Sequence, residues 1–203
     1  MLDQLAQKIK DRSAVIGTIG LGYVGLPLCA AFETAGFRVL GFDIDPERVD
    51  ILNSGRNYLN HLGAHFVSEL RAEDRFEATH DFARLSEADA ILVCEPTPLG
   101  KHLEPDLSFV KSSTDSIATA LRPGQLIVLE STTYPGTTRE DVLPILAPSG
   151  LKVGSEFFLA FSPERVDPGR EDWTTKNTPK VLGGITDACT ERAAELYSRA
   201  LDT

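Results

Sequence analysis

Seven apolar runs recur along the chain, and helical patterns lie between and after them. The runs are AVIGTIG (14–20), RVLGFD (38–43), RFEAT (75–79), AILVCEP (90–96), QLIVLEST (125–132), FFLAFSPE (157–164) and KVLGGI (180–185). Several are continuously apolar, which is typical of strands that are covered on both faces. The helical patterns span 26–36, 46–55, 107–121, 138–147 and 186–201. This order predicts a Rossmann-like α/β fold: a doubly wound, mostly parallel sheet with helices on both faces.

The first 13 residues form a separate element. Leu2, Leu5 and Ile9 fall at helical spacing, so residues 1–13 are expected to form a short amphipathic helix that lies on the domain. No repeat or long linker interrupts the rest, and residues 14–203 are expected to form one domain. Two turn-rich loops, 96–106 and 131–138, directly follow predicted strands. Ligands of open parallel sheets bind outside such strand ends.

Composition and charge narrow the possible partners. The 203 residues carry 20 Lys plus Arg against 30 Asp plus Glu, a formal net charge of -10. This charge repels polyanions, so we expect no nucleic-acid partner. No apolar run approaches the length of a membrane span and the N-terminus is charged, so a cytoplasmic protein without membrane contact is expected. An anionic ligand must therefore be bound by local donors, such as backbone N–H groups at a helix start.

A glycine-rich turn supplies such a helix start. Gly20, Gly22 and Gly25 form G-x-G-x-x-G between the first predicted strand and the helix after it, and the next strand ends in Asp43. In a dinucleotide site the three glycines permit a tight turn, close approach to the pyrophosphate and close helix–strand packing, and the acid binds the adenosine ribose. The alternative is a plain glycine turn, with Asp43 merely capping the following helix. Asp43 favours NAD over NADP, because a carboxylate near the ribose repels a 2′-phosphate. Arg48 either pairs with such a phosphate or faces solvent.

Several motifs together resemble the UDP-glucose/GDP-mannose dehydrogenase family, the nucleotide-sugar 6-dehydrogenases. They are GLGYVGLPL (20–28), GFDID (41–45), CEPTP (94–98), ESTTYPGTT (130–138) and FSPER (161–165), and they follow the family's order and spacing. The resemblance runs from about residue 14 to the end. PDLSFV, YPGTT and SPERVDPG resemble most closely the enzymes that oxidise UDP-N-acetylglucosamine or UDP-N-acetylmannosamine.

The resemblance implies an activity and a cofactor site. Such enzymes oxidise the C6 hydroxyl of the sugar to a carboxylate with two NAD, through an aldehyde and a thioester on a cysteine. By matching positions, Tyr23 and Val24 are expected beside the pyrophosphate, Asp43 and Arg48 at the adenosine end, and Thr97 along the cofactor.

The resemblance also implies the catalytic end of the site. Ser131 and Thr132 match the loop near the nicotinamide, where the threonine helps to hold a catalytic water; without the resemblance they are a polar turn. Glu164 matches an acid/base glutamate that positions or deprotonates water. UDP-glucose enzymes carry a second glutamate shortly afterwards, where this chain has residues 165–168, RVDP. This departure favours an N-acetyl sugar over glucose.

The nucleophile of the family lies outside this sequence. The family places it in a later GGxC-type segment of a further domain, whereas Cys29, Cys94 and Cys189 lack those neighbours and are expected to be reduced core thiols. No metal site is expected, because His61 and His65 are explained by one helix face. Trp173 and Lys180 lie in a polar stretch that either touches substrate or forms a surface loop; Lys180 otherwise only starts a strand.

Three functional hypotheses follow. The first is the NAD-binding domain of a UDP-N-acetylhexosamine 6-dehydrogenase, inactive alone and part of a homodimeric full-length enzyme, with a UDP-glucose enzyme as the variant. The second is a non-catalytic module that senses NAD and controls a partner. The third is a two-domain hydroxyacid-type dehydrogenase, against which the PTP, STTYPGTT and SPER motifs speak together. If the chain is a fragment, exposed apolar surface is expected where it joins the rest.

Overall fold

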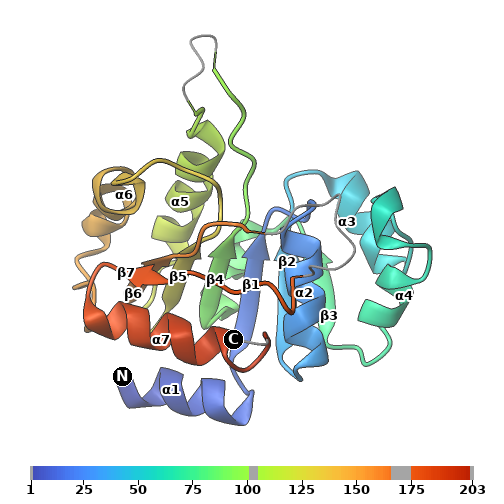
Figure 1. Ribbon diagram of the computed structural model, residues 1–203, viewed down its shortest axis with the longest axis horizontal. Helices are drawn as coiled ribbons and strands as arrows, with labels where there is room; N and C mark the ends of the chain where they lie inside the picture. Colours follow the sequence, from blue (N-terminus) through green and yellow to red (C-terminus); the bar gives the residue numbers. More distant parts are fainter. Residues whose placement is uncertain (1, 101–104, 166–174, 202–203) are drawn as a thin grey trace.

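Seven strands form one sheet in the computed structural model, which describes residues 2–100, 105–165 and 175–201. The strand order is β3-β2-β1-β4-β5-β6-β7, and only β7 is antiparallel to its neighbour (Figure 1). Their bounds are β1 Val15–Ile19, β2 Arg38–Phe42, β3 Phe76–Thr79, β4 Ala90–Val93, β5 Leu126–Leu129, β6 Phe158–Phe161 and β7 Gly183–Gly184. The predicted doubly wound, mostly parallel fold is confirmed.

Helices cover both faces of the sheet because successive strand residues point to opposite sides. In β4, for example, Leu92 packs into one apolar core and Ile91 into the other. The first core receives α1 Leu2–Asp11, α2 Gly25–Thr34, α3 Pro46–Asn53, α4 Phe66–Leu70 and α7 Asp187–Tyr197. The second receives η2 Phe82–Glu87, α5 Ser108–Ala120, η3 Thr138–Val142 and α6 Leu143–Leu146. The remaining short helices are η1 Asn60–Leu62 and η4 Ala147–Ser149.

Helix α1 is attached to the domain by both apolar and ionic contacts. Leu5 and Ile9 are buried, and α1 packs against α7 (Figure 1). The Lys8 ammonium lies 2.8 Å from the carboxylate of Asp89, at the start of β4. Asp89 also pairs with Arg122 at 2.8 Å and accepts a hydrogen bond from the backbone N–H of Val15. A single buried carboxylate therefore joins α1, β1 and the end of α5.

Two sequence predictions need correction. The segment expected as one helix over 138–147 is a π-helical turn followed by α6 and a 3₁₀ turn. His61 and His65 do not share a helix face, because His61 lies in η1, His65 precedes α4, and Gly63 between them has a φ of 80°. The turns η1 and η2 and the five-residue helix α4 have no counterpart among the predicted elements, since none is long enough to show a helical period.

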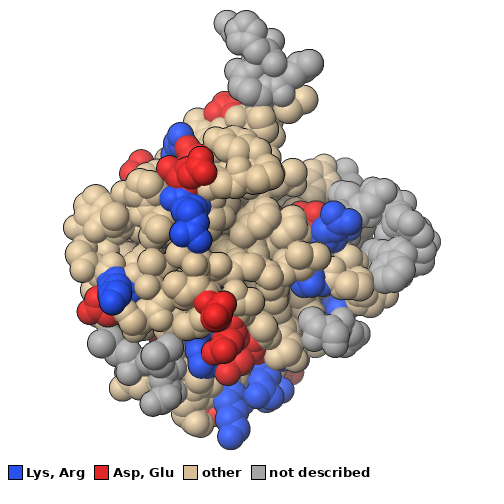
Figure 2. All heavy atoms as spheres, turned by 60° about the vertical axis from the view of Figure 1, so that its left-hand side comes forward, with Lys and Arg blue, Asp and Glu red and all other residues tan. Residues whose placement is uncertain are grey.

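Charged side chains are intermixed on the face drawn in Figure 2, where Lys and Arg lie beside Asp and Glu. No continuous basic patch crosses the described part of that face. Within residues 2–100, 105–165 and 175–201, no helix combines the length and apolar character that crossing a bilayer requires. Trp173, His102 and residues 166–168 of the SPERVDPG motif lie outside the described residues.

Candidate functional site

The parallel register brings the ends of five strands into one row. Ile19 of β1 is opposite Phe42 of β2 and Val93 of β4; Val93 is opposite Leu129, and Leu129 is opposite Phe161. The residue after each strand end therefore lies at the same edge of the sheet: Gly20, Asp43, Cys94, Glu130 and Ser162. Strands β2 and β3 extend the sheet on one side of β1, and β4 to β7 extend it on the other, so the switch point lies between β1 and β4, where open α/β sheets form their ligand crevice.

The glycine turn follows β1 and is sterically closed to larger residues at two positions. Gly20 has a φ of 88°, and a Cβ atom there would lie 2.7 Å from the carbonyl oxygen of Cys94. At Gly25, a Cβ atom would lie 1.9 Å from the carbonyl oxygen of Gly20. The turn and the approach of α2 to β1 therefore both require glycine, as the sequence pattern predicts.

Gly22 differs from both neighbours, because a Cβ atom there would meet no protein atom within 4 Å. Packing alone does not require a glycine at this position. Helix α2 begins three residues later, its N-cap Val24 makes no side-chain cap hydrogen bond, and its first turn holds no acidic residue. No side-chain carboxylate therefore caps the start of α2. Because Gly22 has no side chain, an anionic ligand has room to approach the backbone N–H groups at this helix start.

Asp43 borders the turn from the end of β2. Its carboxylate accepts hydrogen bonds from the backbone N–H groups of Leu21, at 3.3 Å, and of Asp45, at 3.0 Å. Helix α3 is capped by Asp45 instead, which accepts from the N–H of Glu47 at 2.9 Å. The interpretation of Asp43 as merely a helix cap is therefore wrong, and its carboxylate is oriented toward the glycine turn.

Arg48 lies on α3 and is already engaged by two acids. Its guanidinium lies 3.7 Å from the carboxylate of Asp43 and 3.5 Å from that of Asp45. It also lies over the ring of Tyr58, 5.5 Å from the centroid. Tyr58 in turn donates a hydrogen bond to the carbonyl oxygen of Leu21. Arg48 thus does not simply face solvent: its side chain is half-exposed and already paired with two acids, which compete with a phosphate for its charge.

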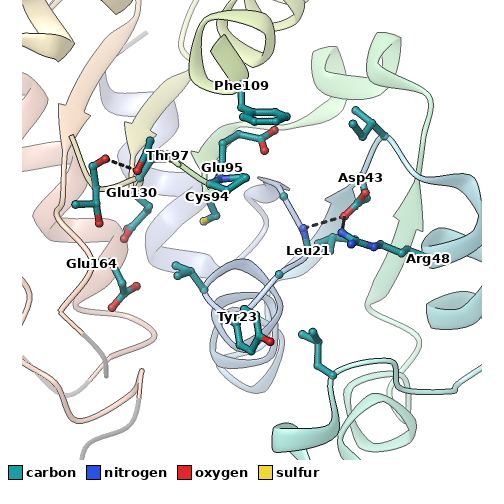
Figure 3. Close-up of a pocket in the computed structure, with 18 of the residues that line it drawn as sticks. Leu21, Tyr23, Asp43, Arg48, Cys94, Glu95, Thr97, Phe109, Glu130 and Glu164 are labelled. Carbon is teal, nitrogen blue, oxygen red and sulfur yellow. Dashed lines mark hydrogen bonds and ion pairs between the residues drawn. The ribbon is translucent and has the colours of Figure 1, made fainter. Parts of the chain in front are cut away.

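These groups open onto one cavity of about 610 Å³ at the strand ends (Figure 3). All the predicted site residues except Gly25 line it; Gly25 lies within the turn and supports its shape. The predicted lining residues are Gly20, Gly22, Tyr23, Val24, Asp43, Arg48, Thr97, Ser131, Thr132 and Glu164. Figure 3 shows Asp43 and Arg48 at one end of the cavity and Thr97 and Glu164 at the other, with Tyr23 between them at its rim. The predicted residues thus line opposite ends of one cavity.

The loops after β4 and β5 are joined at the end opposite Asp43. The Thr97 hydroxyl donates to the carbonyl oxygen of Thr132 at 2.7 Å, and the Ser131 hydroxyl donates to the carbonyl oxygen of Val93 at 3.2 Å. Ser131 is buried, whereas the side chain of Thr132 is exposed toward the cavity. Thr132 is thus available to a ligand, and Ser131 contributes mainly by holding the loop against β4.

A buried ion pair lies beneath this loop, and the sequence analysis missed it. The Lys180 ammonium lies 2.5 Å from the carboxylate of Glu130, and the two side chains are 3% and 0% exposed. Tyr197 of α7 donates a hydrogen bond to the same carboxylate. Burial raises the pKa of Glu130, and Lys180 and Tyr197 oppose that effect. Lys180 is therefore neither a surface residue nor simply a strand start: it pairs with Glu130 at the end of β5, and Tyr197 joins the same carboxylate to α7.

None of the three cysteines of the chain has the exposed, thiolate-stabilising surroundings that a nucleophilic cysteine needs. Cys29, Cys94 and Cys189 are all unpaired and buried. Burial raises the pKa of Cys29 to about 12 and that of Cys94 well above its ordinary value. Because the thiolate is the reactive form, these thiols are inert core residues. Cys94 borders the cavity, but Glu130 raises its pKa further.

Sequence reasoning also missed other cavity residues, among them Tyr58, Phe109 and Glu95. Tyr58 lies in a segment without helical or strand periodicity, and Phe109 is the second residue of α5, where it resembles any apolar helix position. Glu95 sits inside the recognised CEPTP motif and Phe109 inside PDLSFV, so membership of these motifs was the available signal for both. Within the described residues no cluster of His, Cys, Asp and Glu suits a metal ion.

The fold and this site define an NAD-binding Rossmann domain of a dehydrogenase. The glycine cradle, the uncapped α2 start and Asp43 fit an NAD molecule laid across the strand ends. Over residues 14–201 the chain matches the NAD binding domain of the UDP-glucose/GDP-mannose dehydrogenase family, and it belongs to that family. A different hydroxyacid-type dehydrogenase, the third hypothesis, is thereby set aside.

Known relatives agree with this assignment. The chain is 35% identical over 183 residues to the UDP-N-acetyl-D-glucosamine 6-dehydrogenase of Pseudomonas aeruginosa, covering 90% of this chain and 42% of that one. It is 36% identical over 201 residues to the UDP-N-acetyl-D-mannosamine dehydrogenase of Escherichia coli (strain K12), covering 93% and 46%. The crystal structure of NDP-N-acetyl-D-galactosaminuronic acid dehydrogenase from Methanosarcina mazei Go1 aligns with a TM-score of 0.86 and 35% identity, over 99% and 45% of the two chains. The chain thus spans less than half the length of these relatives.

Proposed function

We propose that this chain is the cofactor domain of an enzyme that oxidises C6 of a UDP-N-acetylhexosamine to the uronic acid with two NAD. One observation carries the proposal: a glycine turn, an uncapped helix start and a buried carboxylate converge on a single cavity. The positive end of the α2 dipole offsets the negative net charge of the chain for an approaching pyrophosphate.

Each end of the cavity has its own task. Backbone N–H groups around Gly22 and Val24 bind the pyrophosphate, and Asp43 accepts hydrogen bonds from the adenosine ribose. At the opposite end, Thr132 and Glu164 line the part of the cavity where the nicotinamide would lie. Bound NAD accepts the hydrides of the oxidation. Thr132 helps to hold the water of the hydrolytic step, and Glu164 positions that water or removes its proton.

The substrate class rests on relatives and on one departure in the sequence. The curated relatives named above act on UDP-N-acetyl sugars, as their names state. This chain lacks the second glutamate expected of UDP-glucose enzymes after Glu164. UDP-glucose remains the alternative substrate, and parallel assays of NADH formation by the full-length enzyme with UDP-N-acetylglucosamine, UDP-N-acetylmannosamine and UDP-glucose discriminate them.

The chain alone binds NAD and does not complete the oxidation, because its three cysteines are all buried. The thioester step needs a reactive thiolate, which these residues do not offer. We propose that the remaining part of a homodimeric enzyme supplies it together with the UDP-sugar site. A non-catalytic NAD-sensing module is the second candidate, and the same burial of all three thiols favours it. NADH formation by the full-length enzyme decides between the two.

Calorimetry with NAD tests the cofactor site directly. We expect the wild-type chain to bind NAD and Asp43→Ala to weaken binding at least tenfold, or by about 1.4 kcal/mol. Asp43→Asn keeps the shape of the side chain and removes its charge, so it should also weaken binding. Asp50→Ala, an exposed position on α3 outside the cavity, serves as the control. Absence of NAD binding to wild type, or equal affinity in Asp43→Ala, contradicts the proposal.

A further inference from the structure

We propose that Glu95 is a second specificity residue for the cofactor: its carboxylate, together with Asp43, excludes a 2′-phosphate from the adenosine end of the cavity. The inference rests on the proposed NAD site. It assigns to Glu95 a role in discrimination rather than in binding, so that its removal changes the response to NADP and leaves the response to NAD nearly unchanged.

Glu95 is fixed in place by the protein. It follows β4 directly after Cys94, and the hydroxyl of Ser113 on α5 donates to its Oε1 atom at 2.6 Å. Ser113 is itself buried, with 5% of its surface exposed. A carboxyl held by a buried hydroxyl on a neighbouring helix has few alternative rotamers, since turning away would leave that hydroxyl without its acceptor. Its carboxyl group therefore stays at the wall of the cavity.

The carboxyl groups of Glu95 and Asp43 affect the same part of the cavity. Both residues line it, and Figure 3 shows Glu95 beside the ring of Phe109, facing the side that Asp43 borders. Burial raises the pKa of Glu95 first of all, and the negative charge of Asp43 raises it further, whereas Ser113 opposes both. Two acids that repel each other in the empty cavity both repel an added phosphate.

The local cation does not offset this repulsion. Among the lining residues of the described chain, Arg48 is the only Lys or Arg. Its guanidinium already lies within 4 Å of the Asp43 and Asp45 carboxylates. A phosphate monoester carries about -1.5 to -2 charges at neutral pH. To pair with it, Arg48 must share its single positive charge between the phosphate and the two carboxylates, whereas the uncharged 2′-hydroxyl of NAD requires no such sharing.

Paired titrations of NAD and NADP test the inference. In mildly alkaline buffer, we expect Glu95→Gln to raise the affinity for NADP about tenfold, equal to about 1.4 kcal/mol. Its affinity for NAD should stay within about threefold of wild type. Glu191→Gln removes one exposed carboxylate from α7, outside the cavity, and controls for net charge. Glu95→Leu removes the same charge with an apolar side chain of similar size, and it replaces Glu95→Gln if that variant does not fold.

The outcomes separate the inference from the proposed function. A wild-type chain that binds no NAD contradicts the proposed site itself. Wild-type NAD binding combined with an unchanged NADP affinity in both Glu95 variants overturns only the inference. Loss of NAD affinity in these variants without a gain in NADP affinity also overturns it, because Glu95 would then be a direct binding residue. A similar gain in Glu191→Gln would assign the effect to net charge and overturn it as well.

Discussion

Gly22 and Gly25 provide a matched pair of perturbations, because packing requires glycine at one position and leaves room for a side chain at the other. The same substitution, Gly to Ala, adds one methyl group at each position. At Gly25 the added Cβ atom would lie 1.9 Å from a backbone oxygen, whereas at Gly22 it would meet nothing within 4 Å. Gly22 also has no positive φ, so alanine is conformationally allowed there.

The two substitutions should affect different quantities: Gly25→Ala the free energy of unfolding, and Gly22→Ala the affinity for NAD. Gly25→Ala requires a backbone shift between α2 and β1, and we expect it to lower the free energy of unfolding by about 3 kcal/mol. For a chain of this size that corresponds to a Tm decrease of about 6–12 °C. Gly22→Ala should change the free energy of unfolding by less than about 1 kcal/mol. Its methyl group occupies the approach to the α2 start, and losing two charge-assisted hydrogen bonds there weakens NAD binding by about 3–6 kcal/mol.

Thermal unfolding and calorimetry, run on the same preparations, measure both effects. We expect Gly22→Ala to melt like wild type and to lose NAD binding by a factor of 100 or more, about 2.7 kcal/mol. Gly25→Ala should melt earlier with or without cofactor. If Gly22→Ala binds NAD as tightly as wild type, the pyrophosphate does not lie at this turn, and the reasoning from the open space at Gly22 is refuted.

Two further predictions concern stability. Lys180→Met leaves the buried Glu130 carboxylate without its cation, so we expect chemical denaturation to show that the free energy of unfolding falls by about 3–5 kcal/mol. The control, Lys111→Met, removes an exposed ion pair and should lower it by less than about 1 kcal/mol. Equal losses in the two variants would contradict a buried pair. Burial tends to raise the pKa of Asp89, but its ion pairs and hydrogen bonds lower it below 3.8. Its contribution to stability is therefore present above the unfolded-state value and lost as the pH falls through the lower folded-state value. Asp89→Asn should destabilise the chain at neutral pH, and urea titrations should show the difference from wild type shrinking below pH 3.8; a constant difference would argue against linkage.

The sequence predicts the sheet well because its strands are buried on both faces. Runs such as AILVCEP are continuously apolar, and the glycine turn adds a local constraint that only a few backbone geometries satisfy. Polar contacts between distant segments leave no such periodic signal. The pairing of Lys180 with Glu130 joins positions 50 residues apart, and nothing near Lys180 in the sequence distinguishes it from a surface lysine.

The same contrast holds for the predicted site: local motifs identify some of its residues, whereas contacts between distant segments leave no signal in the sequence. Motif positions identify ten of the nineteen residues that line the cavity, because strand ends in a parallel sheet meet at one edge. They do not reveal that Asp45, and not Asp43, caps α3, or that Tyr58 returns to the glycine turn from a loop. Those contacts depend on side-chain geometry that two neighbouring elements determine together. The functional roles of the site residues stay predictions.

The two outer strands determine how this sheet meets other molecules. Strand β7 pairs with only two residues of β6, and Gly184 packs so closely on α7 that a Cβ atom would lie 2.4 Å from the backbone nitrogen of Thr190. At the other edge, Glu77 of β3 is exposed and paired with Arg84. A two-residue glycine strand and a four-residue strand with an exposed charge are poor templates for further pairing. The domain thereby carries protection against edge-to-edge aggregation in its own fold.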